Sequence, residues 1–373
     1  MMYDRNMEEK LWKVMDRLIS HGHQAYIVGG AVRDILLDKR PKDYDICTDA
    51  RPKDVIAIFS DLDMFKSGLK HGTVTIVIDH EPFEITTFRK DGPYRDGRHP
   101  DHVYFSDDVL DDLKRRDFTI NAILMDIDEK IVDPLGGRND ILQRCIRAIG
   151  DPYVRFKEDH LRILRAIRFK AELDFVIDKK TEEAMFIEKD ALKEISNERM
   201  ADEFIKMVKS NDLKIFDRYR DILGVFIKYG KDVIDYRQSN DLRVRLALLF
   251  KDEPTQLDKL FLGKKVTREI KELIAYQNYE DDDLTLIFSK VDPKLFISFI
   301  GILKGLDLSQ IYDEIKTYIV NEKTLAIKAN ELMDMGYKGK RLGLIKKDLV
   351  KRILAQDLKN THDDIMTYLK EVL

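Results

Sequence analysis

Short β-type runs separated by turn residues occupy the first part of the chain, up to about residue 145. They are AYIVGG at 25–30, YDIC at 44–47, TVTIVID at 73–79, FEITTF at 83–88 and AILMDI at 122–127. Each is rich in β-branched or aromatic residues and has turn residues at its borders, which is typical of strands. The runs at 73–79 and 83–88 flank the turn residues His80 to Pro82 and predict a hairpin.

Apolar residues recur at helical spacing almost everywhere after Gly150, as in the segment EDHLRILRAIRFKAEL. This periodicity predicts a helical remainder. We therefore expect an α+β fold class, with a mixed or antiparallel sheet and its helices first and an all-helical part afterwards. No internal repeat or low-complexity linker marks boundaries within the helical half.

The composition is that of a globular protein. The chain has 373 residues, 44% of them apolar, which suffices for two or three domains with real cores and excludes fibrous and disordered classes. No run approaches the ~20 apolar residues of a membrane span, and the charged N-terminal segment is unlike a signal peptide, so we expect a cytoplasmic protein. Cys47 and Cys145 are too isolated for a disulfide framework or a zinc cluster and are expected to be packing residues.

The formal net charge of -4, from 65 basic and 69 acidic residues, argues against a nucleic-acid partner only if the charges are evenly spread. They are not: residues 138–170 hold nine Lys and Arg against four Asp and Glu, and residues 338–359 hold eight against two. Either run alone is equally consistent with a solvated helix face. Two such runs in a mildly acidic protein are what contacts with a phosphate backbone would need.

A glycine turn leads from the first predicted strand into a helix. Gly29 and Gly30 follow AYIV and precede AVRDILL. Glycines let backbone N–H groups approach a phosphate, the helix N-terminus adds its dipole, and Arg33 lies one turn into the helix. Taken alone, this pattern fits a tight turn without a ligand better than a phosphate site.

Two aspartates, Asp43 and Asp45, follow in the segment KDYDICT. In an extended segment residues i and i+2 point to the same side, and Mg²⁺ would offset the repulsion of the paired carboxylates. Such a pair alone is common in surface turns, but after a glycine turn and a helix it places triphosphate and metal side by side. Glu84 offers a third carboxylate among apolar neighbours, and a salt bridge within the sheet explains it equally well.

The segments GGAVRD and DYDICT resemble the head domain of the DNA polymerase β-type nucleotidyltransferase superfamily, specifically the class II tRNA nucleotidyltransferase (CCA-adding enzyme) and bacterial poly(A) polymerase family. Further motifs agree in order and spacing: RRDFTINA at 115–122, DPLGGRNDI at 133–141, RFKEDHLRILRAIRF at 155–169 and ISNERMADEF at 195–204. The match covers roughly residues 25–205, whereas the later helices are similar only in character. The resemblance implies a catalytic head at 1–145, a base-recognising neck at 146–210, and a body at 211–315 and a basic tail at 316–373 that bind tRNA.

The resemblance also implies roles for individual residues. Two catalytic magnesium ions would be held by Asp43 and Asp45, with Glu84 as a further candidate ligand. The 3′-hydroxyl of an RNA would displace pyrophosphate in line, without a covalent enzyme intermediate. The remaining nucleotide contacts would be Gly29, Gly30 and Arg33 at the triphosphate, Arg116, Asp117 and Asn121 at the ribose and phosphates, Arg115 near phosphate or the RNA end, and Arg165 and Arg168 as additional nucleotide-binding residues.

Asp159 and Arg162 match the family motif that reads the incoming base. On one helix from Glu158 they would share the polar face, opposite the apolar arc that includes Ile163 and Ile167. An aspartate accepts a hydrogen bond from the amino group of cytosine or adenine and an arginine donates one to the adjacent ring nitrogen, whereas uracil and guanine mismatch both. Without the resemblance, an ordinary salt-bridged helix surface explains the same residues.

The segment RKDGPYRDGRHP, residues 89–100, has two glycines, two prolines and no apolar periodicity, which predicts a mobile surface loop. Its candidate functional residues are Arg89, Asp91, Tyr94 and Arg98, and a hairpin connection without function is the alternative. By resemblance, enzymes that add only cytidines lack this loop, so its presence argues against a C-only enzyme.

We therefore expect a magnesium-dependent enzyme that adds CCA to the 3′ end of tRNA from CTP and ATP, with no membrane and no obligate protein partner evident. An A-adding tRNA nucleotidyltransferase and a poly(A) polymerase stay open, because they share the head motifs. A third hypothesis is a catalytically inert RNA-binding relative, which the intact Asp43, Asp45, Asp159 and Arg162 disfavour.

Overall fold

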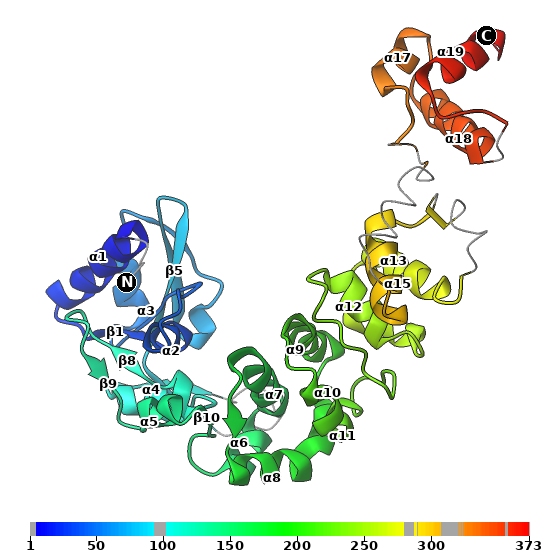
Figure 1. Cartoon of the computed structure of the whole chain (residues 1–373). Helices are drawn as coiled ribbons and strands as arrows, with labels where there is room; N and C mark the ends of the chain where they lie inside the picture. The colour runs from blue at the N-terminus through cyan, green and yellow to red at the C-terminus, as the bar shows by residue number, and fades with distance from the viewer. Residues whose placement is uncertain are drawn as a thin grey trace. The chain divides into compact units, whose positions relative to one another are not determined.

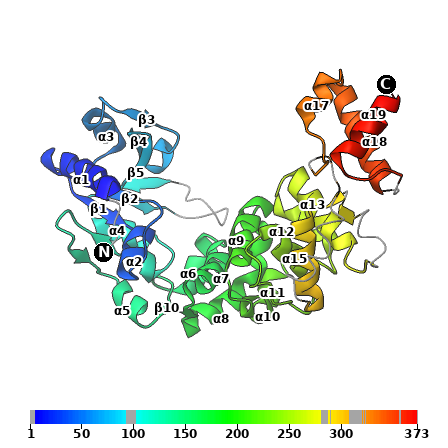
Figure 2. The ribbon, with the colours of Figure 1, turned by 45° about the horizontal axis from the view of Figure 1, so that its top comes forward.

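The computed structural model describes residues 5–92, 102–279, 287–288, 290–306, 320, 322, 324–354 and 357–372. The chain forms two compact units, Met1–Phe226 and Ile227–Leu373. Strands are confined to the first unit among the described residues, and helices form the rest (Figures 1 and 2). The predicted α+β class is therefore confirmed, whereas the division into head, neck, body and tail stays a prediction.

A seven-stranded sheet dominates the first unit, in the order β3-β4-β5-β2-β1-β8-β9. Strands β2 and β5 are parallel and all other neighbours in the sheet are antiparallel. The β-branched residues Ile27, Ile46 and Ile85 of its central strands are fully buried, which is why these short runs form strands. The strands are β1 (Ala25–Val28), β2 (Asp45–Thr48), β3 (Asp63–Phe65), β4 (Thr73–Ile78), β5 (Glu81–Thr87), β8 (Leu124–Met125) and β9 (Ile131–Val132).

The predicted hairpin forms from β4 and β5, but its turn is shorter than the sequence indicated. Pairing continues to Ile78 opposite Glu81, so Glu81 and Pro82 belong to β5. Only Asp79 and His80 make the turn, with φ of 48° and 68°. Two-residue turns with positive φ match the twist of antiparallel strands, which favours this tight connection.

Helices pack around the sheet and then extend the first unit. α1 and α3 contact each other, and α2 contacts β1; further along, α6 packs on α8 and α7 on α9. Two small ladders join distant segments, antiparallel between β6 (Arg89–Asp91) and β7 (Val103–Phe105) and parallel between β10 (Cys145–Ile146) and β11 (Val176–Ile177). The helices are α1 (Arg5–Ser20), α2 (Gly30–Leu36), α3 (Pro52–Ile58), α4 (Val109–Lys114), α5 (Gly137–Leu142), α6 (Pro152–Glu158), α7 (Arg162–Leu173), α8 (Lys179–Glu188), α9 (Asn197–Lys209), α10 (Lys214–Arg218) and α11 (Arg220–Leu223), with the 3₁₀ turns η1 (Leu69–His71), η2 (Thr119–Asn121) and η3 (Lys189–Glu194).

One core of the first unit lies beneath the central strands. Val28 of β1, Cys47 of β2 and Leu124 of β8 pack there with Phe88 and Leu113. Both cysteines are free and buried, which confirms that they are packing residues. The core therefore supports the ends of β1 and β2, where the predicted glycine turn and aspartate pair lie.

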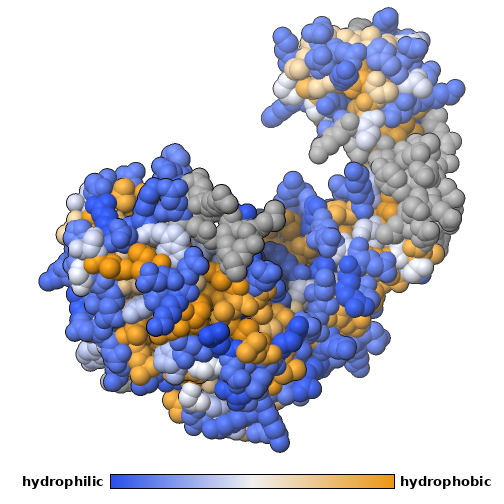
Figure 3. Space-filling model, turned by 60° about the vertical axis from the view of Figure 1, so that its left-hand side comes forward, coloured by the Kyte–Doolittle hydropathy of each residue, from blue (hydrophilic) through white to orange (hydrophobic). Residues whose placement is uncertain are grey.

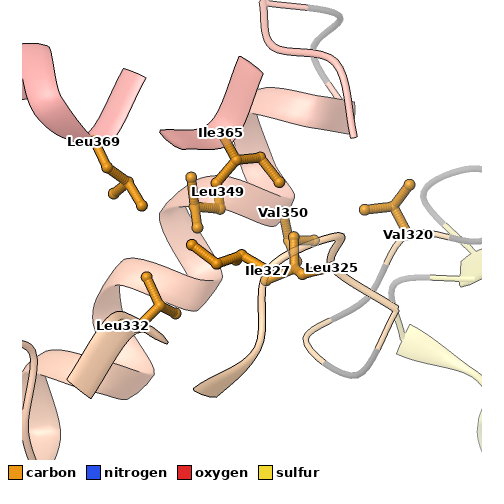
Figure 4. Close-up of a cluster of buried hydrophobic side chains, with 8 residues drawn as sticks. All are labelled: Val320, Leu325, Ile327, Leu332, Leu349, Val350, Ile365 and Leu369. Carbon is orange, nitrogen blue, oxygen red and sulfur yellow. The ribbon is translucent and has the colours of Figure 1, made fainter. Parts of the chain in front are cut away.

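The second unit is helical. α12 (Leu242–Leu249) packs on α13 (Lys264–Ala275) and α15 (Pro293–Lys304), with η4 (Pro254–Leu260) between α12 and α13 in sequence. Figure 4 shows a separate cluster around α17 (Ala329–Asp334), α18 (Lys340–Leu354) and α19 (His362–Val372). Its buried members are Val320, Leu325, Ile327, Leu332, Leu349, Val350, Ile365 and Leu369.

None of the helices in the described ranges has the length and apolar character needed to cross a membrane. Polar and charged residues cover much of the face seen in Figure 3, interrupted by apolar areas.

Candidate active site

One pocket of the first unit brings together most of the predicted site residues. Its volume is about 460 Å³, and its walls come from the β1–α2 turn, the start of β2, the segment around η2 and the helix α7. Six arginines and four aspartates line it, which suits a polyanion bound with metal. The lining residues are Gly29, Gly30, Arg33, Asp43, Asp45, Arg115, Arg116, Asp117, Asn121, Asp159, Arg162, Arg165, Arg168 and Phe169.

The glycine turn forms as the sequence predicted. Gly29 caps α2 with φ of 82° and ψ of -133°, a conformation that side-chain-bearing residues rarely adopt. A Cβ atom at Gly29 would lie 3.4 Å from Nη1 of Arg116 and 4.0 Å from Oδ2 of Asp45. The turn therefore needs glycine for its backbone shape, and it directs the N-terminus of α2 at the pocket.

The aspartate pair stands at the entry to β2. Asp45 is the first residue of the strand, and Asp43 lies two residues before it, outside the strand. Loss of hydration within the pocket wall raises the pKa of Asp45 to about 6; the charges of Asp43 and Glu84 add to the rise and Arg116 opposes it. Loss of hydration is therefore the main reason why the ionised form of Asp45 is poorly stabilised here.

Glu84 lies beside Asp45 in the parallel β2–β5 pairing. Its side chain is exposed, because the pleat turns Glu84 away from the core that receives Phe83 and Ile85. Glu84 and Asp45 both line a second, smaller pocket of about 210 Å³. Among the described residues, no group of three or more His, Cys, Asp and Glu side chains is arranged to hold a metal ion.

A chain of hydrogen bonds crosses the floor of the pocket. Arg33 donates from Nη1 to Oδ1 of Asn121 at 2.7 Å, and Asn121 donates from Nδ2 to Asp117 at 3.0 Å. Arg165 of α7 donates from Nε to the other oxygen of Asp117 at 2.8 Å. Burial alone would raise the pKa of Asp117, but the charge of Arg165 and the Asn121 hydrogen bond outweigh it and lower that pKa to about 2. Asp117 is therefore a fixed anion that joins α2 to α7.

Asp159 and Arg162 line the same pocket wall, but not on one helix. α6 ends at Glu158, Asp159 is extended (φ -137°, ψ 102°), and α7 begins at Arg162, so the expected continuous helix from Glu158 is wrong. Asp159 faces Arg199 of α9, with 3.5 Å between Oδ1 and Nη2. Arg162 is buried, and donates to Glu158 at 3.0 Å and to the carbonyl of Arg115 at 2.7 Å.

Arg162 and Arg168 are also more buried than a free polar face would allow, because the helix packs on both sides. Leu161, Ile163, Leu164 and Ile167 are buried, as the apolar arc predicted. Because the helix is broken before Arg162, Asp159 lines the pocket from an extended stretch and Arg162 lines it from the N-terminus of α7.

Phe169 and Arg199 were not singled out from the sequence. Phe169 ends the motif RFKEDHLRILRAIRF and lines the pocket, and Arg199 lies in ISNERMADEF and pairs with Asp159. Their positions within these two family motifs are the only sequence signal that could have identified them. Only the packing of α7 against α9 brings Arg199 to Asp159.

The predicted loop begins as a strand. Arg89 and Asp91 belong to β6, so the expected loop does not start at Arg89, and Arg89 lines the smaller pocket beside Glu84. Tyr94 and Arg98 lie outside the described residues.

Two family models match the first unit and define the class of protein to which it belongs. Residues 25–147 match the family model "Poly A polymerase head domain", and residues 174–218 match "Probable RNA and SrmB- binding site of polymerase A". The sheet, the glycine turn and the aspartate pair all lie within the first match or at its edge. The first unit is therefore built on the head of a nucleotidyltransferase.

Relatives that align along nearly the whole of both chains identify the family within this class of protein. The chain is 33% identical over 385 residues to the CCA-adding enzyme of Lactobacillus johnsonii, with 95% of each chain covered, and 34% identical over 393 residues to that of Lactococcus lactis subsp. lactis, with 96% of each covered. The Bacillus stearothermophilus CCA-adding enzyme, solved in complex with CTP, matches with a TM-score of 0.74 and 27% identity over 97% of this chain and 96% of that one. The chain belongs to the family of tRNA nucleotidyltransferases that comprises the CCA-adding enzymes.

Proposed function

We propose that this enzyme adds the sequence CCA to the 3′ end of tRNA from CTP and ATP, releasing pyrophosphate, without a nucleic-acid template. The observation that carries the proposal is the single pocket that holds the glycine turn, the aspartate pair and the base-reading pair. Relatives called CCA-adding enzymes align over 95% or more of both chains, and a similar protein has been solved with CTP, which supports the same substrates.

The carboxylates of Asp43 and Asp45 fit a magnesium site. They are hard oxygen donors beside a phosphate-binding turn, and the raised pKa of Asp45 comes mainly from loss of hydration, a cost to its ionised form that a bound divalent cation offsets. When bound, Mg²⁺ neutralises charge on the phosphates and favours ionisation of the attacking hydroxyl. Glu84 lies next to Asp45 but in the smaller pocket, and it is the candidate for contacting the RNA end or a second ion.

The nucleotide's phosphates would lie against the start of α2. The backbone N–H group of Gly30 and the guanidinium of Arg33 supply donors there, whereas the Gly29 N–H donates to the carbonyl of Ile123 at 3.4 Å. Arg165 and Arg168 extend the positive wall from α7. The RNA 3′-hydroxyl oxygen would bond to the α-phosphorus while the bond to the bridging oxygen breaks and pyrophosphate leaves. Arg116, Asp117 and Asn121 would contact the ribose and the phosphates between the turn and the base.

Base choice would rest on Asp159 and Arg162. Asp159 accepts from the amino group of cytosine or adenine, and Arg162 donates to the adjacent ring nitrogen. Their partners support this role: Arg199 orients the carboxylate, while Glu158 and the Arg115 carbonyl fix the guanidinium. A uracil or guanine would leave two charged groups mismatched, which costs several kcal/mol in a desolvated site.

A transcript assay tests the proposal against its alternatives. Three tRNAs ending at the discriminator base, at C and at CC are incubated with magnesium, and CTP and ATP are supplied separately and together. CCA addition to the first and A addition to the last support the proposal. Addition only to the CC-ending tRNA indicates an A-adding enzyme, long adenosine tails indicate a poly(A) polymerase, and no incorporation indicates an inert RNA-binding relative.

The remaining roles are proposed on the same basis. The segment between β6 and β7, which includes Tyr94 and Arg98, would assist the change from C to A addition. The body and the basic tail would hold the tRNA, the tail through residues 338–359. Deletion of residues 93–101, with residues 92 and 102 joined by Gly-Ser-Gly, tests the first role: A addition should fall more than C addition.

A further inference from the structure

The ring of Phe169 lies at the centre of three guanidinium groups. The Cζ atom of Arg168 is 3.8 Å from the ring centroid, that of Arg33 is 5.2 Å away and that of Arg165 is 5.3 Å away. Arg33 comes from α2, whereas Arg165 and Arg168 precede Phe169 by four residues and one residue on α7. All four side chains line the pocket, and the ring itself is only 5% exposed.

The three arginines have other partners that compete for them. Arg33 pairs with Asp34 at 2.8 Å and Arg165 pairs with Asp117. Arg168 pairs with Glu172 at 2.7 Å and with the buried Glu203. A guanidinium has five N–H groups in one plane, so each arginine keeps donors that are not used by its carboxylate. Those donors reach a further ligand only if the plane is oriented toward the pocket. Three like charges in one wall also repel each other, and an aromatic face offsets part of that cost.

Phe169 is itself fixed by the core. Its ring meets the buried ring of Phe118 edge to face, with centroids 5.9 Å apart and an interplanar angle of 85°. Phe118 directly follows Asp117, the anion that anchors Arg165. A rigid apolar support therefore stands behind a cationic wall, and the ring has no hydrogen-bonding group of its own for a nucleotide.

We propose that Phe169 is a positioning residue that holds Arg33, Arg165 and Arg168 as one phosphate-binding group for the incoming nucleoside triphosphate. The proposal rests on the proposed function and names a residue that acts through the arginines. The negative face of the ring attracts all three guanidiniums and keeps their N–H groups directed along its surface toward the pocket. Without the ring, the guanidiniums would keep their carboxylate partners but lose the shared apolar support that fixes their planes, and the wall would bind phosphates less well.

The test compares two substitutions of Phe169 with one matched control in the full-length protein. Phe169→Leu removes the aromatic face and keeps an apolar side chain, whereas Phe169→Tyr keeps the face. Phe204→Leu is the control, because this buried ring of α9 packs on Phe216 and Phe226 away from the pocket lining. Calorimetry with inorganic tripolyphosphate in magnesium buffer measures phosphate binding, and steady-state kinetics give KM and kcat for CTP.

We expect Phe169→Leu to raise the dissociation constant of tripolyphosphate and the KM for CTP by about tenfold each, which is about 1.4 kcal/mol, with kcat within about threefold of the unaltered protein. Inhibition by cytidine, which has no phosphate, should stay unchanged, and Phe169→Tyr should bind tripolyphosphate nearly as well as the unaltered protein. Phe204→Leu should lower the melting temperature without weakening tripolyphosphate binding.

Three results would overturn the proposal: an unchanged tripolyphosphate affinity in Phe169→Leu, an equal loss in the Leu and Tyr variants, or an equal loss in Phe204→Leu. Each would mean that the ring is a packing residue only. The proposed function fails separately, if the unaltered protein adds no nucleotide to tRNA, because tripolyphosphate binding needs no turnover.

Discussion

Gly29 offers a quantitative test of how the backbone shapes the site. Replacement by alanine forces a Cβ onto a residue with φ of 82° and ψ of -133°, a region that costs about 1–3 kcal/mol for residues other than glycine. The new atom would also lie 3.4 Å from Nη1 of Arg116, at the limit of ordinary contact, and 4.0 Å from the Asp45 carboxylate, so the backbone strain falls within a turn that touches site residues. We expect Gly29→Ala to lose about 1–3 kcal/mol of unfolding free energy and most of its activity.

Alanine substitutions at two other glycines serve as controls that distinguish the effect of backbone strain from a loss of function. Gly22 has a similar φ of 84° with nothing within 4 Å of its added Cβ, so Gly22→Ala should lose stability and keep activity. Gly30 lies in α2 without a positive φ, and its Cβ would be 3.6 Å from Arg33, an ordinary contact. Gly30→Ala should therefore fold at least as well as the unaltered chain, because alanine favours helix over glycine by about 1 kcal/mol.

Urea denaturation and kcat/KM for CTP measure both quantities for the three variants. At a temperature where all three variants are folded, we expect only Gly29→Ala to have a reduced kcat/KM for CTP. If Gly29→Ala matched Gly22→Ala in both stability and activity, the closeness of the turn to Arg116 and Asp45 would have no functional consequence, and the phosphate role of the turn would be refuted.

Three further substitutions address the aspartates. Asp43→Asn, at an exposed position, should abolish nucleotide incorporation while the melting temperature stays within a few degrees of that of the unaltered protein. Chelation of magnesium should abolish incorporation reversibly. Retained incorporation in Asp43→Asn would rule out the metal role. Asp159→Ala should lower discrimination against UTP and GTP by at least about tenfold, measured as ratios of kcat/KM, even where CTP turnover persists. Asp140→Ala should lose about 1–3 kcal/mol in urea denaturation, because Thr119 and Arg147 lose their buried acceptor; an unchanged midpoint would contradict that.

Local pattern sufficed for the parts of the site that are contiguous in sequence. The strand before Gly29 and the strand that starts at Asp45 were predictable because short runs rich in β-branched or aromatic residues are bordered there by turn residues. The apolar arc of α7 was predictable from helical spacing, and Ile163 and Ile167 are fully buried as expected. The family motifs then gave Asp159 and Arg162 a shared site that no local pattern implied.

What the sequence could not reveal depends on tertiary contacts. The pairing of Asp159 with Arg199 needs α9 to lie against α7, and helical periodicity is blind to which helix will be the neighbour. The helix break at Asp159 was missed because nothing in EDHLR interrupts the pattern, whereas contacts of Arg162 with the Arg115 carbonyl stabilise the new helix start. The apolar neighbours of Glu84 in sequence do not bury it, because adjacent residues of a strand point to opposite faces of the sheet.

The basic run at 138–170 has a different use from the one its charge alone implied. Arg147 pairs with Asp140 and Asp178, Arg162 with Glu158, and Arg168 with Glu203, so much of the run is committed to internal partners. Arg162, Arg165 and Arg168 of the run line the pocket, whereas Arg144 and Lys157 lie on the open surface. Charges set in a pocket are screened less by salt than exposed ones. The KM for CTP should therefore depend on salt less steeply than the KM for tRNA, which we expect to rest on exposed charges such as those of residues 338–359.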